Sequence, residues 1–481
     1  MPQAKLAEKI DFNQEAVFIE QGFASQEMGP VSSFKPENKA ETKKIALETG
    51  HIYGDFQYCG PFSDSQAKTI RQELVTTRNL INIFGDKLVT PDIESLPPQD
   101  LALRLFADRV VNEAVLVEGA RRAALAVRGE GSDDIDFCKQ EMNYAMEQIY
   151  PAPQRELALS ALGLFHTRLE NLMNDDKSRG LAEETLAKYP FLAEAGGRQP
   201  EVLKPQVQAE VKAYLDSRFA EPFAQVRQEI GEINNDNMTQ AVKSLMRLLG
   251  FLDQGWAVQF VGDARVGFYV DPTGKKVEVG NRTKEITWPA FEKLMIHEVG
   301  VHVTRAANAY SSGHNLAAAG WVQYENAEEG LAIICEKAWD GKAAEAGVID
   351  RDHYRYIIGA FASGALDGNY HGPDDSFNLA TRLSTISGLS TKLKQNKEIN
   401  LAEAESKARS AVFEHVFRFY RGMPDGLVMI KDIIYLDGAN QLVKFLNQTD
   451  RPIAEVLDEF GRGKYNPFIP LQAKAMDGLY A

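Results

Sequence analysis

The chain has 481 residues, of which 44% are hydrophobic and 25% are charged, as is usual for a folded globular protein. This length exceeds one compact core, so we expect two or three cooperating units. The formal net charge of -15 argues against nucleic acid and against anionic membranes as partners, because phosphate binding requires clustered Lys and Arg.

Three cysteines, Cys59, Cys138 and Cys335, lie far apart and without CxxC spacing. They predict buried thiols in a reducing compartment rather than a disulfide framework or a thiolate zinc site. The N terminus lacks the basic and apolar regions of a secretory leader, and no window approaches about 18 uncharged apolar residues. We therefore expect a soluble, cytoplasmic protein, and the oligomeric state stays open.

The first two predicted units differ in the spacing of their apolar residues and in their content of Gly, Pro and Ser. Residues 1–62 contain Gly, Pro and Ser without a sustained period, which predicts a loosely structured N-terminal arm. Residues 63–250 show apolar steps of three and four, which predict a helical domain with one helix starting after Pro97-Pro98. Further helices are predicted at 134–150, 154–174, 206–230 and 236–252.

The pattern changes at Trp256. The runs WAVQFV, RVGFYV and KKVEVG are rich in Val, Phe and Tyr, and DPTG joins the last two, so they predict a hairpin within a small antiparallel sheet over about 256–280. Pro289 then opens a helix that carries His297. This order is typical of a zincin-like metallopeptidase core, predicted at 251–481 with C-terminal helices. The expected fold class is α+β, mostly helical.

The helix opened by Pro289 carries a motif with metal-ligand chemistry. His297, Glu298 and His302 form HExxxH, one residue longer than the common HExxH. On a regular helix the two histidines lie about 140° apart, too wide to hold one ion. A π-type turn would restore a shared face, and Gly300 would tolerate it. The alternative is a chance pairing of two histidines on an apolar helix.

A catalytic zinc site also needs a third protein ligand. Glu328-Glu329-Gly-Leu-Ala is predicted to open a second helix, 26 residues after His302. A carboxylate there would complete a His, His, Glu set, and Glu298 could then act as general base. The alternative is an acidic pair in a first helical turn, favoured by the helix dipole. The remaining candidate histidines lack a partner at ligand spacing and are expected on the surface or in the core: His314, His353, His371 and His415.

Three blocks together resemble a known family. HEVGVHVTRAAN, then EEGLA, then FRFYRG with KDIIYLDG, follow in order over about 297–438. They are similar to the signature blocks of the microtubule-associated tyrosine carboxypeptidase family, which includes bacterial members named for a QEGLA motif. The resemblance implies zinc on His297, His302 and Glu329, catalysis by Glu298, and removal of a C-terminal aromatic residue from a peptide or protein.

The chain departs from the bacterial motif at Glu328, where those members have Gln, and in this it resembles the eukaryotic members. Its arm and loops are its own, so tubulin as a substrate does not follow.

An exopeptidase must also hold the terminal carboxylate of its substrate, which requires Arg or Lys near the metal. The candidates are Arg418, Arg421 and Lys431, with Arg305 one turn beyond His302. Tyr435 could donate a hydrogen bond to the developing oxyanion. Each of these side chains could instead be solvated or salt-bridged.

Two other functions stay open at this point. One is a zinc endopeptidase with a similar core. The other is a regulatory or scaffolding protein with a structural metal, against which Glu298 argues, because a structural zinc site is closed by four ligands and needs no base.

Overall fold

The computed structural model describes residues 39–51, 93–127, 129, 134–262, 267–281, 285–345 and 349–481. Over these ranges the chain is mostly helical with a small sheet, which confirms the predicted α+β, mostly helical class. Of the predicted arm at 1–62, only residues 39–51 are described, and the division of the chain at residues 62 and 250 stays a prediction.

The helices before the sheet follow the predicted pattern closely. Their bounds are α2 (Lys39–Thr49), η1 (Ile93–Ser95), α4 (Pro98–Val127), α5 (Ile135–Ile149), α6 (Arg155–Met173), α7 (Arg179–Lys188), α8 (Phe191–Glu194), α9 (Pro205–Ile230), α10 (Met238–Leu248) and η2 (Leu252–Gln254). The helices expected at 134–150, 154–174, 206–230 and 236–252 are confirmed as α5, α6, α9 and α10. α4 begins at Pro98, where the missing N–H costs no helical hydrogen bond.

The sheet is mixed rather than antiparallel. Its strands are β1 (Ala257–Val261), β2 (Phe268–Asp271) and β3 (Lys276–Gly280), in the order β1-β3-β2. β2 and β3 form the predicted antiparallel hairpin, but β1 pairs with β3 in parallel, so the fully antiparallel prediction was wrong. β3 carries the buried Val277 and Val279 and therefore takes the centre, whereas the more exposed β1 lies at an edge.

Helices return after the sheet and continue to the C terminus. Their bounds are α11 (Trp288–His297), η3 (Glu298–Val303), α12 (Thr304–Ser311), α13 (Asn315–Ala319), α14 (Tyr324–Trp339), α15 (Arg351–Ala362), α16 (Pro373–Lys394), α17 (Leu401–Tyr420), η4 (Ile430–Ile433), α18 (Ile434–Gln448), α19 (Ile453–Phe460) and α20 (Pro470–Tyr480). Pro289 lies in the first turn of α11, as predicted. α14 begins at Tyr324, four residues before its predicted start, so Glu328 and Glu329 lie beyond the first turn.

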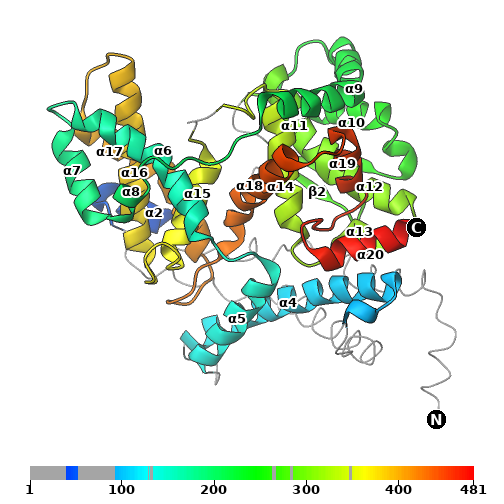
Figure 1. Cartoon of the computed structure of the whole chain (residues 1–481), viewed down its shortest axis with the longest axis horizontal. Coiled ribbons are helices and arrows are strands. Elements are labelled where there is room, and N and C mark those ends of the chain that lie inside the picture. Colours follow the sequence, from blue (N-terminus) through cyan, green and yellow to red (C-terminus); the bar gives the residue numbers. More distant parts are fainter. Residues whose placement is uncertain are drawn as a thin grey trace.

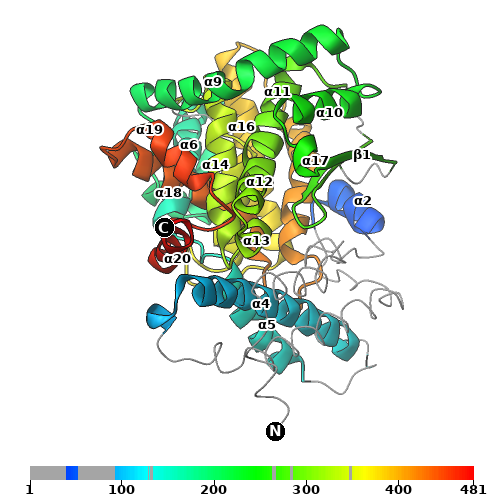
Figure 2. The ribbon, with the colours of Figure 1, turned by 90° about the vertical axis from the view of Figure 1, so that its right-hand side faces the viewer.

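Two lobes meet along α14, α15 and α18 (Figure 1). One apolar core joins α5, α6 and α8 to α15, α16, α17 and η4, and a second joins α9, α10, α11, η3 and the sheet to α14, α18 and α19. Tyr435 packs against both cores. Figure 2 shows α4 and α5 beneath α13 and α20, where α4, α13 and α20 share a third, smaller core. The sheet contacts the metal-motif helix through β2 and η3.

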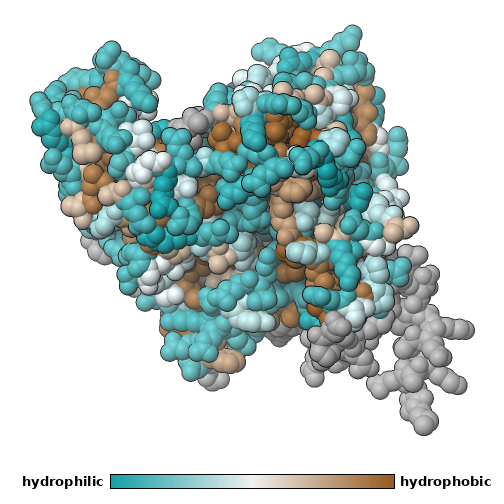
Figure 3. Space-filling view, viewed as in Figure 1, coloured by the Kyte–Doolittle hydropathy of each residue, from teal (hydrophilic) through white to brown (hydrophobic). Residues whose placement is uncertain are grey.

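The face shown in Figure 3 is largely hydrophilic, with apolar residues gathered mainly toward its middle. None of the helices in the described ranges combines the length and the hydropathy needed to cross a membrane. Cys138 and Cys335 are buried, as predicted, and Cys59 lies outside the described residues.

Two glycines allow α14 and α18 to cross at close range. A Cβ atom on Gly438 would overlap the carbonyl oxygen of Asn326, and one on Gly330 would overlap the backbone of Gly438. Next to this crossing the buried Asp437 accepts a hydrogen bond of 3.1 Å from Asn326, and burial raises the pKa of Asp437 to about 6. The glycines in EEGLA and in YLDG therefore set the distance between the two helices.

Gly438→Ala is expected to destabilise the protein by about 1–3 kcal/mol, because the new methyl group would force the helices apart. Gly388→Ala is the matched control, since Gly388 is also in a helix but a Cβ there meets nothing within 4 Å. That control should be neutral or stabilising by up to about 1 kcal/mol. Denaturation midpoints followed by circular dichroism measure both, and equal midpoints for the two variants would contradict the close crossing.

Candidate metal centre

The metal-motif helix is distorted between its two histidines. α11 ends at His297, and η3, a π-helix, covers Glu298–Val303. The N–H of Thr304 bonds to the carbonyl of Val299, five residues back, and the Thr304 hydroxyl donates to the same oxygen at 2.9 Å. The wider turn lets histidines at i and i+5 share one face, and the departure from α geometry at Gly300 is confirmed.

His297, His302 and Glu329 come together on this face. One potential ligand atom from each lies within 4.8 Å of the others. Nε2 of His297 is 3.4 Å and Nε2 of His302 is 3.9 Å from Oε2 of Glu329, and the two imidazole centroids are 5.0 Å apart. The three donors therefore converge on one point.

The other ring nitrogen of each histidine is held by a second carboxylate. Nδ1 of His297 lies 3.1 Å from Glu336, and Nδ1 of His302 lies 3.3 Å from Glu328. Such carboxylates orient imidazoles and increase their basicity as metal ligands. Two lysines in turn hold the carboxylates: Lys293 is 2.9 Å from Glu336 and the buried Lys464 is 3.0 Å from Glu328. Both Nε2 atoms are thereby directed toward Glu329.

The group fits a zinc ion. Oε2 of Glu329 is buried and makes no hydrogen bond to the described residues, a costly state for a carboxylate without a nearby cation. Two imidazole nitrogens and one carboxylate oxygen are a donor set of catalytic zinc sites. His297, His302 and Glu329 would hold the ion.

Burial and neighbouring charges shift the pKa values of Glu298 and Glu329 in opposite directions. The pKa of Glu298 is raised, because burial outweighs the attraction of His302 and His297. Burial also raises the pKa of Glu329, but His302 and His297 outweigh it, and the net shift is downward. Glu298 is therefore the better proton acceptor and Glu329 the better ligand.

Tyr435 of α18 lies close enough to Glu329 to feel its charge, and Lys431 of η4 is another neighbour of Tyr435. The carboxylate of Glu329 is the largest cause of the raised pKa of Tyr435, followed by burial, so its hydroxyl keeps a proton to donate. Lys431 contributes to the same environment, but its ammonium pairs with Glu325 at 3.0 Å.

The three candidate arginines differ in how many of their guanidinium N–H groups form hydrogen bonds within the protein. Arg305 is almost fully buried and donates to the carbonyls of Gly463 and Tyr465, so it supports the segment that carries Lys464. Arg418 forms a two-bonded pair with Asp432. Arg421 is partly buried, and its Nε makes no hydrogen bond to the described residues.

In the described ranges the other four candidate histidines do not join the metal group. His314 packs against Tyr480, His353 caps α15 with Asp350, and His371 pairs with Asp367. The pKa of His415 is lowered to about 4 by burial and by neighbouring arginines, so this side chain is neutral at physiological pH.

Sequence reasoning missed the carboxylates and lysines behind the histidines. Glu336 follows Glu329 by two helical turns, so helical periodicity places it on the same face and could have identified it. Lys464 lies 136 residues from Glu328, and no local pattern relates them.

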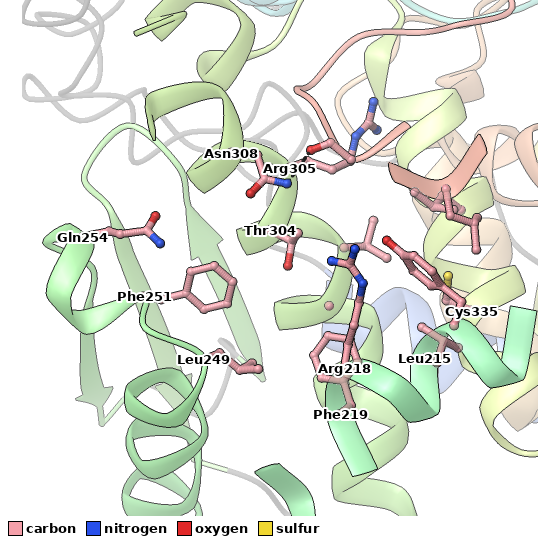
Figure 4. A pocket seen from close by; sticks show the side chains of 16 residues that line it. Leu215, Arg218, Phe219, Leu249, Phe251, Gln254, Thr304, Arg305, Asn308 and Cys335 are labelled. Atoms are coloured by element: carbon pink, nitrogen blue, oxygen red, sulfur yellow. Dashed lines mark hydrogen bonds between the residues drawn. The ribbon is translucent and has the colours of Figure 1, made fainter. Parts of the chain in front are cut away.

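A cavity of about 300 Å³ lies on another face of η3 (Figure 4). Phe219, Thr304 and Cys335 line it, and none of the three potential metal ligands does. Burial raises the pKa of the Cys335 thiol to about 12, so it is a poor nucleophile. A Cβ on Gly300 would lie 3.2 Å from the Phe219 ring, so Gly300 also allows α9 to pack against η3.

Glu329→Ala should abolish tight zinc binding, because it removes one of three ligands. Glu336→Gln should weaken zinc binding by about 10- to 100-fold, because the His297 ring loses its charged partner. Glu170→Gln is the control, since Glu170 lies 3.8 Å from Nδ1 of His166 on the distant α6. Chelator competition with elemental analysis measures all three, and undiminished zinc in Glu329→Ala would move the third ligand elsewhere.

Comparisons of the chain with models of protein families, with curated proteins and with solved structures find no match.

Proposed function

We propose that the chain is a zinc-dependent carboxypeptidase that removes a C-terminal aromatic residue, Tyr or Phe, from peptides or proteins. The observation that carries this proposal is the convergence of His297, His302 and Glu329 across a π-turn, with Nδ1 of each imidazole held by a carboxylate. The three sequence blocks that resemble tyrosine carboxypeptidases supply the reaction and the substrate class. Their residues include the whole metal group and Tyr435.

Each residue has one role in this proposal. Zinc, when bound, would act as a Lewis acid on a carbonyl group and acidify water. Glu298 accepts the proton of the attacking water and passes it to the leaving amine. Tyr435 donates a hydrogen bond to the negative charge that develops on the carbonyl oxygen. Glu336 and Glu328 keep the imidazoles in position while this charge moves.

Two alternatives differ from this proposal in what they require. A zinc endopeptidase would use the same residues without needing a free substrate C terminus. A scaffolding protein with a structural metal would have no use for Glu298, whose raised pKa suits proton transfer, and structural zinc sites are closed by four protein ligands. Within the described residues the metal group offers three.

The zinc-loaded protein is expected to remove one residue from peptides that end in free Tyr or Phe, and to process the same peptides with an amidated end far more slowly. An aromatic side chain gives a pocket a large apolar area to recognise, and amidation removes a charge-assisted contact. Mass spectrometry of paired free-acid and amide peptides measures the difference.

Glu298→Gln provides the control for the mechanism. It should keep zinc while lowering turnover by about two to four orders of magnitude, the usual size of a general-base contribution. Equal internal cleavage of acid and amide peptides would establish an endopeptidase. No cleavage of any free-acid peptide would favour the scaffolding protein.

A further inference from the structure

Three arginines surround Asp432 of η4, and a fourth, Arg351, lies near one of them, Arg355. Arg351 and Arg355 lie on α15, and Arg418 lies on α17. Arg421 is the first residue after the end of α17. We call these four residues the arginine cluster. Nε of Arg355 is 3.6 Å from Asp432, Arg418 pairs with the same carboxylate, and the charges of Arg351 and Arg421 act on these neighbours.

The cluster carries more positive charge than its carboxylates neutralise. Arg418 occupies both oxygens of Asp432, and Arg351 donates to Asp352 at 3.4 Å. Glu414 acts on Arg418 and Arg421 from α17, but its carboxylate is shared with Lys39 and Lys43 of α2. Arg355 makes only long ion pairs, at 3.6 Å to Asp432 and 3.7 Å to Asp352, and both carboxylates already pair with other arginines. Arg421 forms no ion pair with the described residues.

Arg355 and Arg421 also have guanidinium nitrogens that lack a hydrogen bond. The Arg355 side chain is 7% exposed, and its nearest carboxylate oxygens, on Asp432 and Asp352, are 3.6 and 3.7 Å away. Nε of Arg355 and Nε of Arg421 are buried and make no hydrogen bond to the described residues. A buried guanidinium nitrogen without a hydrogen bond is costly, and an anion bound here would offer acceptors to both Nε atoms.

The surplus charge also acts on His415. It lies on α17, and its pKa falls to about 4 through burial and through the charges of Arg355 and Arg351, against the opposing effect of Asp432. The histidine thus stays neutral, and the positive charge of this region comes from the arginines.

Tyr435 connects the cluster to the metal centre. Its ring centroid is 5.2 Å from the guanidinium carbon of Arg355, and the carboxylate of Glu329 is the strongest influence on its hydroxyl. Tyr435 also packs against the cores of both lobes, so it is a neighbour that the cluster and the metal group share. Figure 1 shows α15 and α18, which carry Arg355 and Tyr435, side by side between the lobes.

We propose that Arg355 and Arg421 bind a carboxylate of a peptide whose scissile bond lies at the metal centre. This inference rests on the proposed function and identifies its anion-binding residues. Guanidinium groups suit the task because their planar, paired donors match a carboxylate. Arg351 and Arg418, 58% and 34% exposed, give the cluster a solvent-facing side. The carboxylate belongs to the peptide's C terminus or to an acidic side chain, and the experiment separates these sources.

Direct binding tests the assignment without turnover. Zinc-loaded full-length Glu298→Gln protein is titrated with three labelled peptides: one ending in free Tyr, the same peptide amidated, and an amidated version with Glu before the Tyr. The free acid should bind at least about tenfold tighter than the neutral amide, as expected for a charge-assisted contact. Added to this background, Arg355→Gln and Arg421→Gln should each reduce the preference to within about twofold.

Arg382→Gln is the matched control, because Arg382 pairs with Glu184 on the same lobe but lies outside the cluster, and it should keep the preference. Circular dichroism and zinc content verify that each variant is folded. If Arg355→Gln does not fold, the more exposed Arg421→Gln carries the test. A preference for the Glu-containing amide that is lost in the same variants would support the cluster and assign it to an acidic side chain.

Two results would overturn the proposal: equal affinity for all three peptides, including no binding of any, or a preference that persists in both arginine variants. These failures are separable from failure of the proposed function. Loss of the preference in the variants, combined with a parental protein that cleaves nothing, would keep the anion site and reject the hydrolase. Cleavage without any carboxylate preference would keep the hydrolase and reject the anion site.

Discussion

The π-turn of η3 is the feature on which the rest of the site depends. In a regular helix His297 and His302 would point in different directions, and no arrangement of other residues would give them a common ion. At the end of the wider turn the carbonyl of Val299 accepts both the N–H and the hydroxyl of Thr304. Gly300 tolerates the distorted backbone of this turn, and its missing side chain also leaves space for Phe219 of α9.

A second constraint is the crossing of α14 and α18 at Gly330 and Gly438. It places Glu329 on one helix against Tyr435 on the other, and larger residues at the crossing would separate them. Two groups of charged residues adjoin these side chains. Lys464 and Lys293 hold the carboxylates behind the histidines, whereas Arg355 of the arginine cluster contacts the Tyr435 ring. The candidate site is thus built from charged residues at the boundary of two lobes.

Much of this could be predicted from local sequence. The HExxxH spacing predicted an irregular helix if both histidines bind one ion, the turn in DPTG predicted the β2–β3 hairpin, and helical periodicity located the long helices. The start of α14 was missed because its first turn has few apolar residues, and the parallel β1 was missed because burial of Val277 and Val279 decides strand order. The arginine cluster depends on packing between helices far apart in sequence, so the sequence alone could not separate Arg421 from the paired Arg418.

The most direct test of this account is a crystal structure of the zinc-loaded full-length protein with anomalous diffraction measured on both sides of the zinc absorption edge. The account predicts one strong anomalous peak bonded to Nε2 of His297, Nε2 of His302 and an oxygen of Glu329, at distances of about 2.0–2.2 Å. Glu336 and Glu328 should stay on the two Nδ1 atoms. An empty group at saturating zinc, or a peak held by other residues, would contradict the account.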